Sequence, residues 1–570
     1  MNATSRAARA EILRLARPTA AQSAPGLLTG LAAAASTVAL LACSAWLIVR
    51  ASEHPPVMFL GMAVVGVRAF ALARAFFRYL ERLFSHDAAF RSLERVRVHV
   101  FERLVPLAPD GLGGTSRGGA LSAMVSDIDD LQDHPLRVVQ PIVTSVGVAL
   151  LAVGFLATIS PNAALTLFVS LVVFTIVTAG ASSLVAARAE RSIAPLRSAL
   201  VDAVVEHMRG LDVLIAYGRA DRSLARVAAA DALLTRAVVR RAAGTAIGAA
   251  ALSLFGGAAV ALALVVSIPA AVSGSLGGPA FAVVVLVPLA VFEIVAMVPQ
   301  ALGVSRHVTA AADRVAATAP EQRPPHVPAE TGGPAAPSPS DAPALELSHV
   351  SATWGDGSRA LARVDLTLAE GERVWIDGES GSGKTSLAHV IVRFLDHEGD
   401  YRLRGVDVRS LHPDAVRQVV GLVEQKPFLF DESIRQNLLF AREDADDDTL
   451  VAVLERVGLG EWLVARGGLD ARVGERGALV SGGQAGRIAL ARALLRDFPI
   501  IVLDEPTASV ESDLADALLR DLLDASAGRT VVLISHADVP DGLDVPRATM
   551  TAGVLGRAIP VRAVPAPAVP

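Results

Sequence analysis

The chain is poor in lysine, cysteine and aromatic residues. It has one cysteine in 570 residues, 4 % aromatic side chains, and two lysines among 52 basic residues. The single cysteine, Cys43, excludes an internal disulfide and a metal cluster built on cysteine ligands. Charged residues are also few, at 19 %, and a net charge of −5 is too small to indicate binding to nucleic acid.

Apolar residues, in contrast, are abundant. They make up 52 % of the chain, and the mean hydropathy is +0.48. A bilayer-spanning helix takes about 20 residues, and six stretches of the first half are long enough. We therefore expect an α-helical six-span transmembrane domain, with spans near residues 26–50, 56–80, 138–159, 162–185, 243–268 and 279–303.

Arginine is distributed unevenly between these spans. The connections 51–55, 160–162 and 269–278 contain neither Arg nor Lys, whereas 81–137 and 186–241 contain many. By the positive-inside rule, the N-terminus, both long connections and everything after residue 303 are cytoplasmic. The long connections are predicted to be helical, with a short transverse helix at residues 118–132 within the first of them.

Composition divides the chain into four parts. Residues 319–343 contain eight prolines, so we expect an extended, poorly ordered linker there. The transmembrane domain is then residues 1–318, and a soluble α/β domain follows at 344–556. A Pro/Ala/Val-rich tail, 557–570, is expected to be disordered.

One of the two lysines lies in a glycine-rich loop between a predicted strand and a predicted helix. Such a loop closes backbone N–H groups around phosphates, and the Lys384 ammonium reaches the β- and γ-phosphates on a flexible stem. Thr385 is placed to ligate Mg²⁺. The residues predicted to bind ATP here are Gly378, Glu379, Ser380, Gly381, Ser382, Gly383, Lys384, Thr385 and Ser386.

Two further motifs complete an ATPase. An apolar strand ends in Asp504, predicted to hold Mg²⁺, and Glu505, predicted to act as the general base on water. A second predicted anion site precedes a helix. Because the loop at Lys384 already holds a phosphate, we expect this second site to cap the γ-phosphate of a facing subunit. It consists of Ser481, Gly482, Gly483 and Gln484.

The order of these motifs resembles that of the ATP-binding cassette transporters. The resemblance implies an α/β P-loop ATP-binding cassette domain in which Trp354 stacks on adenine. It also implies that Gln425 senses Mg²⁺ and the membrane domain, and that His536 contacts the γ-phosphate. Residues 473–477 resemble the exporter-specific loop that touches the transverse helices.

One position departs from the family's usual sequence. Glu511 stands where the family usually has Asp, which puts the coupling of two ATP sites in doubt.

Six spans and one cassette resemble a half-transporter of the exporter type. A working unit then needs two chains, and in that scheme ATP closes the cassettes while hydrolysis resets them.

The second predicted span carries a stripe of charge. Arg74, Arg78, Arg82 and His86 recur every four residues and so share one helix face. Arginine within a span is costly, and we expect it to face a cavity or a partner. The stripe is therefore a candidate cationic wall for an anionic substrate.

Structural alternatives remain open for these arginines. Arg78 and Arg82 lie near the cytoplasmic end and can extend to lipid headgroups. Arg68 and Arg74 lie deeper and can pair with Glu293 of the sixth span or with the other subunit.

Several strings in the membrane half resemble the CydC subunits of the CydDC exporter family. They are residues 44–48, 55–56, 78–91 and 214–219. The resemblance implies a heterodimer with a CydD-like half-transporter in the bacterial cytoplasmic membrane, needed for assembly of cytochrome bd oxidase. It also implies export of cysteine and glutathione, movement of haem, or both.

Haem suggests a role for the histidine that ends the stripe. We expect His86 to be an axial ligand with Arg78 or Arg82 near the propionates. The alternative is a structural histidine paired with Asp87. The chain has no CxxC, so it is predicted to move thiols without reacting with them.

Two other functions compete. One is a lipid, peptide or drug exporter of the same architecture, against which the arginines of the second span argue. The other is a non-transporting ATPase with a regulatory or scaffold role, which degenerate ATPase motifs would favour. Apart from Glu511, the motifs are intact.

Overall fold

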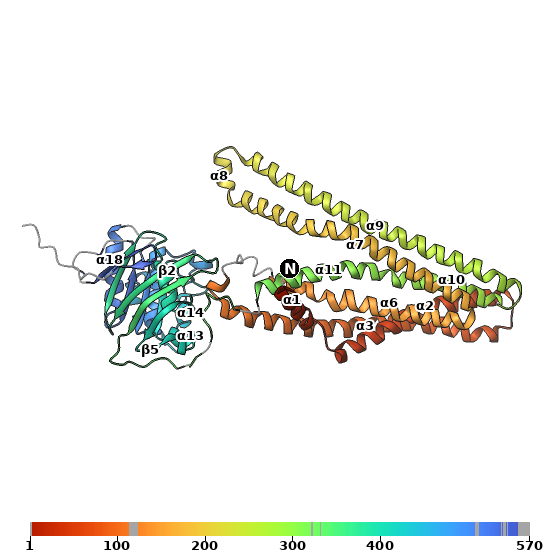
Figure 1. Cartoon of the computed structure of the whole chain (residues 1–570), viewed down its shortest axis with the longest axis horizontal. Helices are drawn as coiled ribbons and strands as arrows, with labels where there is room; N and C mark the ends of the chain where they lie inside the picture. The colour runs from red at the N-terminus through yellow and green to blue at the C-terminus, as the bar shows by residue number, and fades with distance from the viewer. Residues whose placement is uncertain are drawn as a thin grey trace, which may run out of the picture. The chain divides into compact units, whose positions relative to one another are not determined.

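The computed structural model divides the chain into two units, which are described separately (Figure 1). The first unit comprises residues 1–103 and 117–321, and the second comprises residues 104–116 and 322–570. The structure describes residues 3–112, 123–320, 323–330, 332–333, 335–507, 512–536, 539, 543 and 545–556. Glu511, the predicted tail and residues 118–122 of the predicted transverse helix lie outside the described residues.

The first unit is built from helices. Within the described residues, six helices are long and apolar enough to cross a membrane, which confirms the six-span prediction. The helices of this unit are α1 (Ala3–Leu15), α2 (Ala20–Ser52), α3 (Val57–Leu104), the π-helical η3 (Ala123–Asp127), α5 (Ile128–Leu131), the π-helical η4 (His134–Val139), α6 (Gln140–Ile159), α7 (Pro161–Arg209), α8 (Leu211–Ala216), α9 (Ala220–Val272), α10 (Gly278–Val295) and α11 (Met297–Thr318).

An aromatic cluster helps to hold three of the spans together. Phe174 of α7 packs edge-on against Phe255 of α9 and Phe292 of α10, with ring centroids 5.9 Å and 5.5 Å away. This is a favoured geometry for aromatic rings, because the positive edge of one meets the negative face of another. Around it, small and branched side chains of α2, α6 and α10 complete a buried apolar core.

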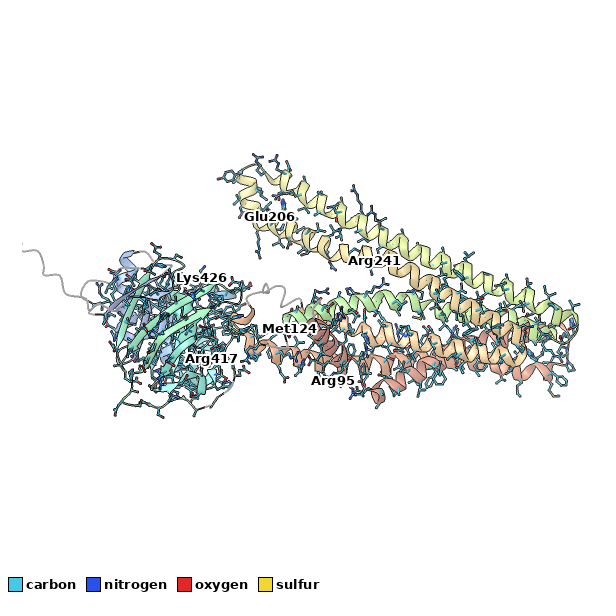
Figure 2. The ribbon with its side chains drawn as sticks, in the orientation of Figure 1. Arg95, Met124, Glu206, Arg241, Arg417 and Lys426 are labelled. Atoms are coloured by element: carbon cyan, nitrogen blue, oxygen red, sulfur yellow. The ribbon has the colours of Figure 1, made fainter. Side chains whose placement is uncertain are left out.

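The second long connection is helical, as predicted. Helices α7 and α9 run side by side and are joined at their far end by the short helix α8 (Figure 1). Near that end Glu206, labelled in Figure 2, lies 3.5 Å from Arg226, and His207 Nδ1 lies 3.0 Å from the Ser223 hydroxyl. Polar contacts thus join the two helices where they extend past their apolar segments.

Helix α3 is packed differently along its length. No residue from 57 to 84 is buried in this chain, whereas Ser85, Ala89 and Val96 are buried further along. The first 28 residues of α3 therefore add no fully buried side chain to this chain's core, although a few contact its other helices, as where the Cys43 thiol donates to Ala63 O at 3.4 Å.

The second unit contains two sheets. The four-stranded sheet is antiparallel in the order β2-β1-β4-β5, and the six-stranded sheet has the order β10-β9-β3-β8-β7-β6. In the larger sheet β3, β6, β7, β8 and β9 pair in parallel, and β10 is antiparallel to β9. The strands are β1 (Leu345–Thr353), β2 (Arg359–Leu368), β3 (Arg373–Gly378), β4 (Glu398–Leu403), β5 (Val406–Asp407), β6 (Val420–Val423), β7 (Ile500–Asp504), β8 (Thr530–Ile534), β9 (Arg547–Thr551) and β10 (Val554–Leu555).

The central strands are apolar on both faces because helices and the smaller sheet cover them. Every residue of β7 and β8 is buried, as expected for parallel strands at the centre of an α/β domain. The helical elements of this unit are η1 (Val105–Leu107), η2 (Asp110–Leu112), α12 (Lys384–Ile391), η5 (Val408–Ser410), α13 (Pro413–Arg417), α14 (Ile434–Leu439), α15 (Asp447–Arg456), α16 (Gly460–Arg466), η6 (Glu475–Gly477), α17 (Gly482–Leu495) and α18 (Ser512–Ala525).

The proline-rich linker makes backbone hydrogen bonds with the folded domain in the residues described, and its poor order stays a prediction. Gly333 donates its N–H to Ser410 O at 2.9 Å, and its own carbonyl accepts from His412 N at 2.8 Å. The carbonyl of His326 likewise accepts from Asp396 N at 2.8 Å. A segment without regular structure thus satisfies backbone groups on the folded domain, a pairing that composition does not reveal.

Candidate functional site

The phosphate loop joins β3 to α12 and depends on two glycines with positive φ angles. Gly378 and Gly383 have φ values of +147° and +107°, a region that side-chain-bearing residues rarely adopt. A Cβ on Gly378 would lie 2.2 Å from Met550 O, and one on Gly383 would lie 2.6 Å from Ala360 O. The sequence therefore forms this loop only with glycine at both positions.

The loop lysine is held by backbone carbonyls. Lys384 Nζ donates to Gly378 O at 2.8 Å and to Glu379 O at 2.9 Å, and it lies 3.2 Å from His536 Nε2. The residue is only 5 % exposed. Its ammonium is thus fixed beside His536, the residue predicted to contact the γ-phosphate. A bound phosphate would replace the two carbonyl oxygens as the acceptor of its hydrogen bonds.

Three predicted catalytic residues come together at one edge of the larger sheet. Gln425, Glu505 and His536 follow the parallel strands β6, β7 and β8, whose carboxyl ends share that edge. Glu505 Oε2 accepts a hydrogen bond from Gln425 Nε2 at 2.5 Å, and its Oε1 lies 2.9 Å from His536 Nε2. A carboxylate held between an amide and an imidazole is well placed to orient and deprotonate a water molecule.

The oxygen ligands at this edge fit Mg²⁺. Asp504 is 4 % exposed and accepts a hydrogen bond from the Thr385 hydroxyl, while its Oδ1 has no hydrogen-bond partner among the described residues. Burial raises the pKa of the Asp504 carboxyl, and the Thr385 hydrogen bond opposes that shift. Thr385, Asp504 and Gln425 supply hydroxyl, carboxylate and amide oxygens, the hard donors that Mg²⁺ prefers.

A cavity of about 850 Å³ links Thr385, Gln425, Glu505 and His536 to Trp354, whereas Asp504 does not line it. Gly378, Glu379 and Ser382 do not line it, since the first two carbonyls hold the lysine and Ser382 is buried. Sequence reasoning missed Ser358, Arg359 and Ala360, which line the cavity around the start of β2. Their only signal was their closeness in sequence to Trp354. The lining residues are Trp354, Ser358, Arg359, Ala360, Ser380, Gly381, Gly383, Lys384, Thr385, Ser386, Gln425, Glu505 and His536.

The predicted second anion site is formed but lies apart from this cavity. Ser481 caps the N-terminus of α17, where its Oγ accepts from Gln484 N at 3.3 Å and its N–H donates to Gln484 Oε1 at 2.9 Å. None of residues 481–484 lines the chain's own ATP cavity. Gly482 and Ser481 are exposed, so the site is open to a ligand held elsewhere.

The predicted exporter loop is anchored at one end and exposed in the middle. Val473 is buried and donates its N–H to Glu432 O at 3.1 Å, whereas Glu475 and Arg476 are exposed. Its contact with transverse helices stays a prediction.

Three residues of the charged stripe lie on the unburied part of α3, and His86 follows that part directly. Arg74, Arg78, Arg82 and His86 are all exposed in this chain. Beyond the last of them Phe90 approaches the imidazole, with ring centroids 6.0 Å apart.

The chain itself does not form the local pairs considered as alternatives. Asp87 accepts a hydrogen bond from Arg91 Nε at 3.0 Å instead of pairing with His86. Among the described residues Glu293 is exposed and makes no ion pair with Arg68 or Arg74. Among the described residues the stripe side chains make no ion pair, although the charge of Glu81 acts on Arg78, Arg82 and His86.

A second cavity, of about 520 Å³, lies within the first unit and is apolar. Trp46 and Cys43 of α2, Phe70 of α3, Phe155 of α6 and Val283 of α10 are among its lining residues. Cys43 contributes a small side chain to this wall, as its apolar setting predicts.

Comparisons with known proteins match both units. Residues 361–508 match the family described as ABC transporter, and residues 25–288 match the ABC transporter transmembrane region. The Escherichia coli glutathione/L-cysteine transport system ATP-binding/permease protein CydC is 31 % identical, over 83 % of this chain and 82 % of that protein. The Bacillus subtilis protein CydD of the same description is 28 % identical, over 88 % and 87 %. A solved structure of a bacterial Atm1-family ABC exporter with ATP bound superposes with a TM-score of 0.80 at 19 % identity, and covers 94 % of each chain.

Proposed function

This chain belongs to the ABC exporters, which hydrolyse ATP to drive transport, and from that premise we propose that it is the CydC-like half of a heterodimer. Its partner is a CydD-like half-transporter. The pair exports a small anionic molecule, a thiol such as glutathione or cysteine, or haem, across the bacterial cytoplasmic membrane. The cassette and N-terminus face the cytoplasm, where the arginine-rich connections lie, and the activity supports assembly of cytochrome bd oxidase.

Hydrolysis is assigned to the cluster at the sheet edge. Glu505 accepts the proton of the attacking water, and His536 contacts the γ-phosphate as charge develops on it. Lys384 neutralises the β- and γ-phosphates from the loop. Mg²⁺, held by Thr385, Asp504 and Gln425, would supply positive charge to the phosphates.

Two chains are proposed because each ATP site needs a second face. The second anion site, residues 481–484, stands apart from the cavity that contains Lys384 and Glu505. A facing subunit would therefore receive this chain's Ser481 and would return its own second anion site. The equivalence of the two resulting sites depends on the motifs of that partner.

The observation that carries the substrate class is the stripe on α3. Arg74, Arg78 and Arg82 lie exposed on a segment that this chain leaves unburied, and the exposed His86 follows directly after that segment. Such a face is too costly to leave against lipid. It suits the carboxylates of glutathione or the propionates of haem, and the imidazole of His86 suits haem iron.

The test is the ATPase rate of the full transporter in lipid discs, titrated separately with haem, glutathione and cysteine. Glu505→Gln provides the blank. Saturable stimulation by haem that is lost in His86→Ala, but kept in His54→Ala at the opposite end of the span, supports a haem translocator. Stimulation by thiols alone supports a thiol exporter, and no response to any of the three contradicts the proposal.

A second candidate, an exporter of a lipid or drug, is favoured by the apolar cavity lined by Trp46, Phe70 and Phe155. An uncharged apolar substrate would stimulate ATP hydrolysis through that cavity. In this case Phe70→Ala would reduce the response and His86→Ala would leave it unchanged.

A further inference from the structure

The segment that follows α3, called here the α3 extension, belongs to the second unit, which binds ATP. It contains η1 and η2. In η2, Asp110 Oδ2 lies 2.6 Å from Nδ1 of His389, and the two side chains are only 10 % and 16 % exposed. A short, largely buried ion pair thus joins the end of the α3 extension to α12, the helix that follows the phosphate loop.

The same histidine also packs against the tryptophan of the ATP cavity. The rings of His389 and Trp354 meet edge-to-face with centroids 6.1 Å apart, and His389 also meets the ring of Phe394 at 5.8 Å. His389 thus contacts two aromatic rings while its Nδ1 is bound to Asp110.

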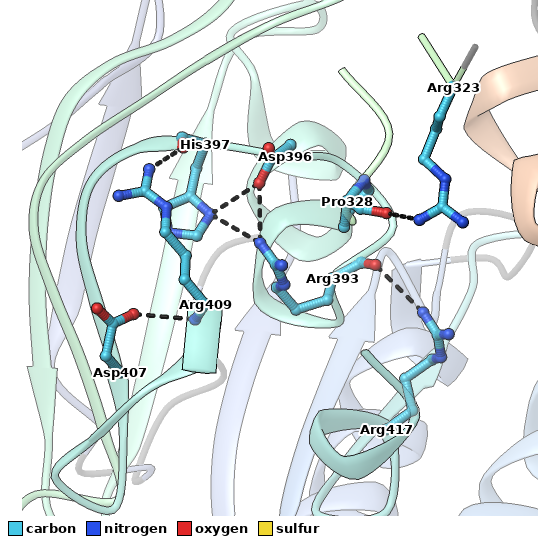
Figure 3. Close-up of polar contacts among 8 residues, drawn as sticks. All are labelled: Arg323, Pro328, Arg393, Asp396, His397, Asp407, Arg409 and Arg417. Atoms are coloured by element: carbon cyan, nitrogen blue, oxygen red, sulfur yellow. Dashed lines mark hydrogen bonds and ion pairs between the residues drawn. The ribbon is translucent and has the colours of Figure 1, made fainter. Parts of the chain in front are cut away.

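The linker also contacts the residues around Asp110 and Trp354. His326 Nε2 lies 3.4 Å from Asp110 O, and its ring covers Gly355, where a Cβ would lie 2.5 Å from His326 Cε1. The backbone of His326 is fixed by Asp396, whose side chain bonds Arg393 in the contacts of Figure 3. The segment that follows α3 and the linker therefore both touch residues beside Trp354.

The charges around His389 favour its protonated form. Burial lowers the pKa of the imidazole, but the hydrogen bond and charge of Asp110, with the charges of Glu424 and Asp504, outweigh burial and raise it. The bond to Asp110 is thus strengthened by charge, which makes it stronger than a neutral hydrogen bond.

We infer that His389 is a positioning residue that sets the Trp354 ring for adenine and is itself held in place by Asp110. The inference rests on the proposed role of Trp354 in binding adenine.

The test measures nucleotide binding to this chain alone within the full transporter. Photolabelling with 8-azido-ATP, followed by separation of the chains, is competed with ATP or with inorganic tripolyphosphate, which has no adenine. The variants are Asp110→Asn, His389→Gln and Trp354→Ala, alone and in pairs. Asp365→Asn is the matched control, since Asp365 forms an exposed pair with His349 at 3.1 Å in the same unit.

The expected result is a roughly fivefold loss of ATP affinity in Asp110→Asn and in His389→Gln, a size typical of coupling between residues in contact. Tripolyphosphate affinity and the control variant should be unchanged. In the Trp354→Ala background neither substitution should weaken ATP binding further.

Two results would overturn the inference. Equal losses for ATP and tripolyphosphate would show that the pair supports the fold and not the adenine contact. Unchanged ATP affinity in Trp354→Ala would show that Trp354 does not contribute to ATP binding, so His389 would have no adenine contact to position. Neither result depends on haem or thiols, so a failure here is distinguishable from a failure of the proposed substrate.

Discussion

His536 Nε2 lies 2.9 Å from Oε1 of Glu505, although 31 residues separate the two in sequence. The contact exists because β7 and β8 are adjacent and parallel, so the residues that follow them emerge side by side. It places a proton donor and acceptor against the carboxylate proposed to activate water.

We predict that Glu505→Gln will reduce ATP hydrolysis by about 10²- to 10⁴-fold, the contribution typical of a general base. The amide keeps the shape of the carboxylate but cannot take a proton, so ATP binding should persist. Single-turnover hydrolysis and filter binding of labelled ATP on the same preparation measure the two properties. Glu398→Gln, at an exposed position of β4, should leave both unchanged, and a Glu505→Gln protein that still turns over would reassign the base.

The Asp110–His389 bond should make stability depend on pH. The pKa of His389 is raised in the folded state above its ordinary value of 6.5. The stabilisation is therefore fully present below pH 6.5 and is lost as the pH rises through the raised pKa. We expect the difference in Tm between wild type and His389→Gln to be largest near pH 6 and to shrink towards pH 9. A difference that grows with pH would contradict this assignment of charge.

His397 should have the opposite dependence. Its ring is buried beside Arg393 and Arg409 (Figure 3), and burial together with these cations lowers its pKa to about 4. The unfolded chain takes up a proton below pH 6.5 while the folded chain does not, so stability falls as the pH drops from 6.5 to about 4. The loss should reach about 3 kcal/mol. In thermal unfolding curves between pH 7 and pH 4.5, His397→Gln should show a flatter decline than wild type.

Arg492 is predicted to be a structural residue of the second unit. It donates to the carbonyls of Asn437 and Phe428, each at 2.7 Å, and also to the Asn437 side chain, while burial lowers its pKa to about 10. Arg492→Ala would leave these acceptors unpaired, and we expect a loss of about 2–4 kcal/mol in the free energy of unfolding. Denaturant titration measures it, with the exposed Arg496→Ala one turn further along as control. A loss no larger than that of the control would show that water replaces the guanidinium.

Much of the ATP site could be predicted because the residues that form it lie in short sequence motifs. The spacing of Gly378, Gly383 and Lys384 has few other uses, and Glu505 ends an apolar strand whose buried character is plain in the sequence. The sequence did not indicate how the strands are ordered in the sheet, and that order brings Gln425, Glu505 and His536 together.

Other features left no local signal. Asp110 and His389 are 279 residues apart, and neither lies in a recognisable motif, so only the folded chain reveals their pairing. The backbone contacts of the linker left no local signal for a related reason. Its prolines indicate a segment without regular structure, but the hydrogen bonds of Gly333 depend on acceptors and donors supplied by residues 410 and 412.

The unburied start of α3 also bears on how the protein is made. A newly inserted copy without its proposed partner would hold Arg74 against hydrocarbon, which costs several kcal/mol. We predict that membrane proteases degrade such a copy. The amount of this chain in a cell would then follow the synthesis of the proposed partner.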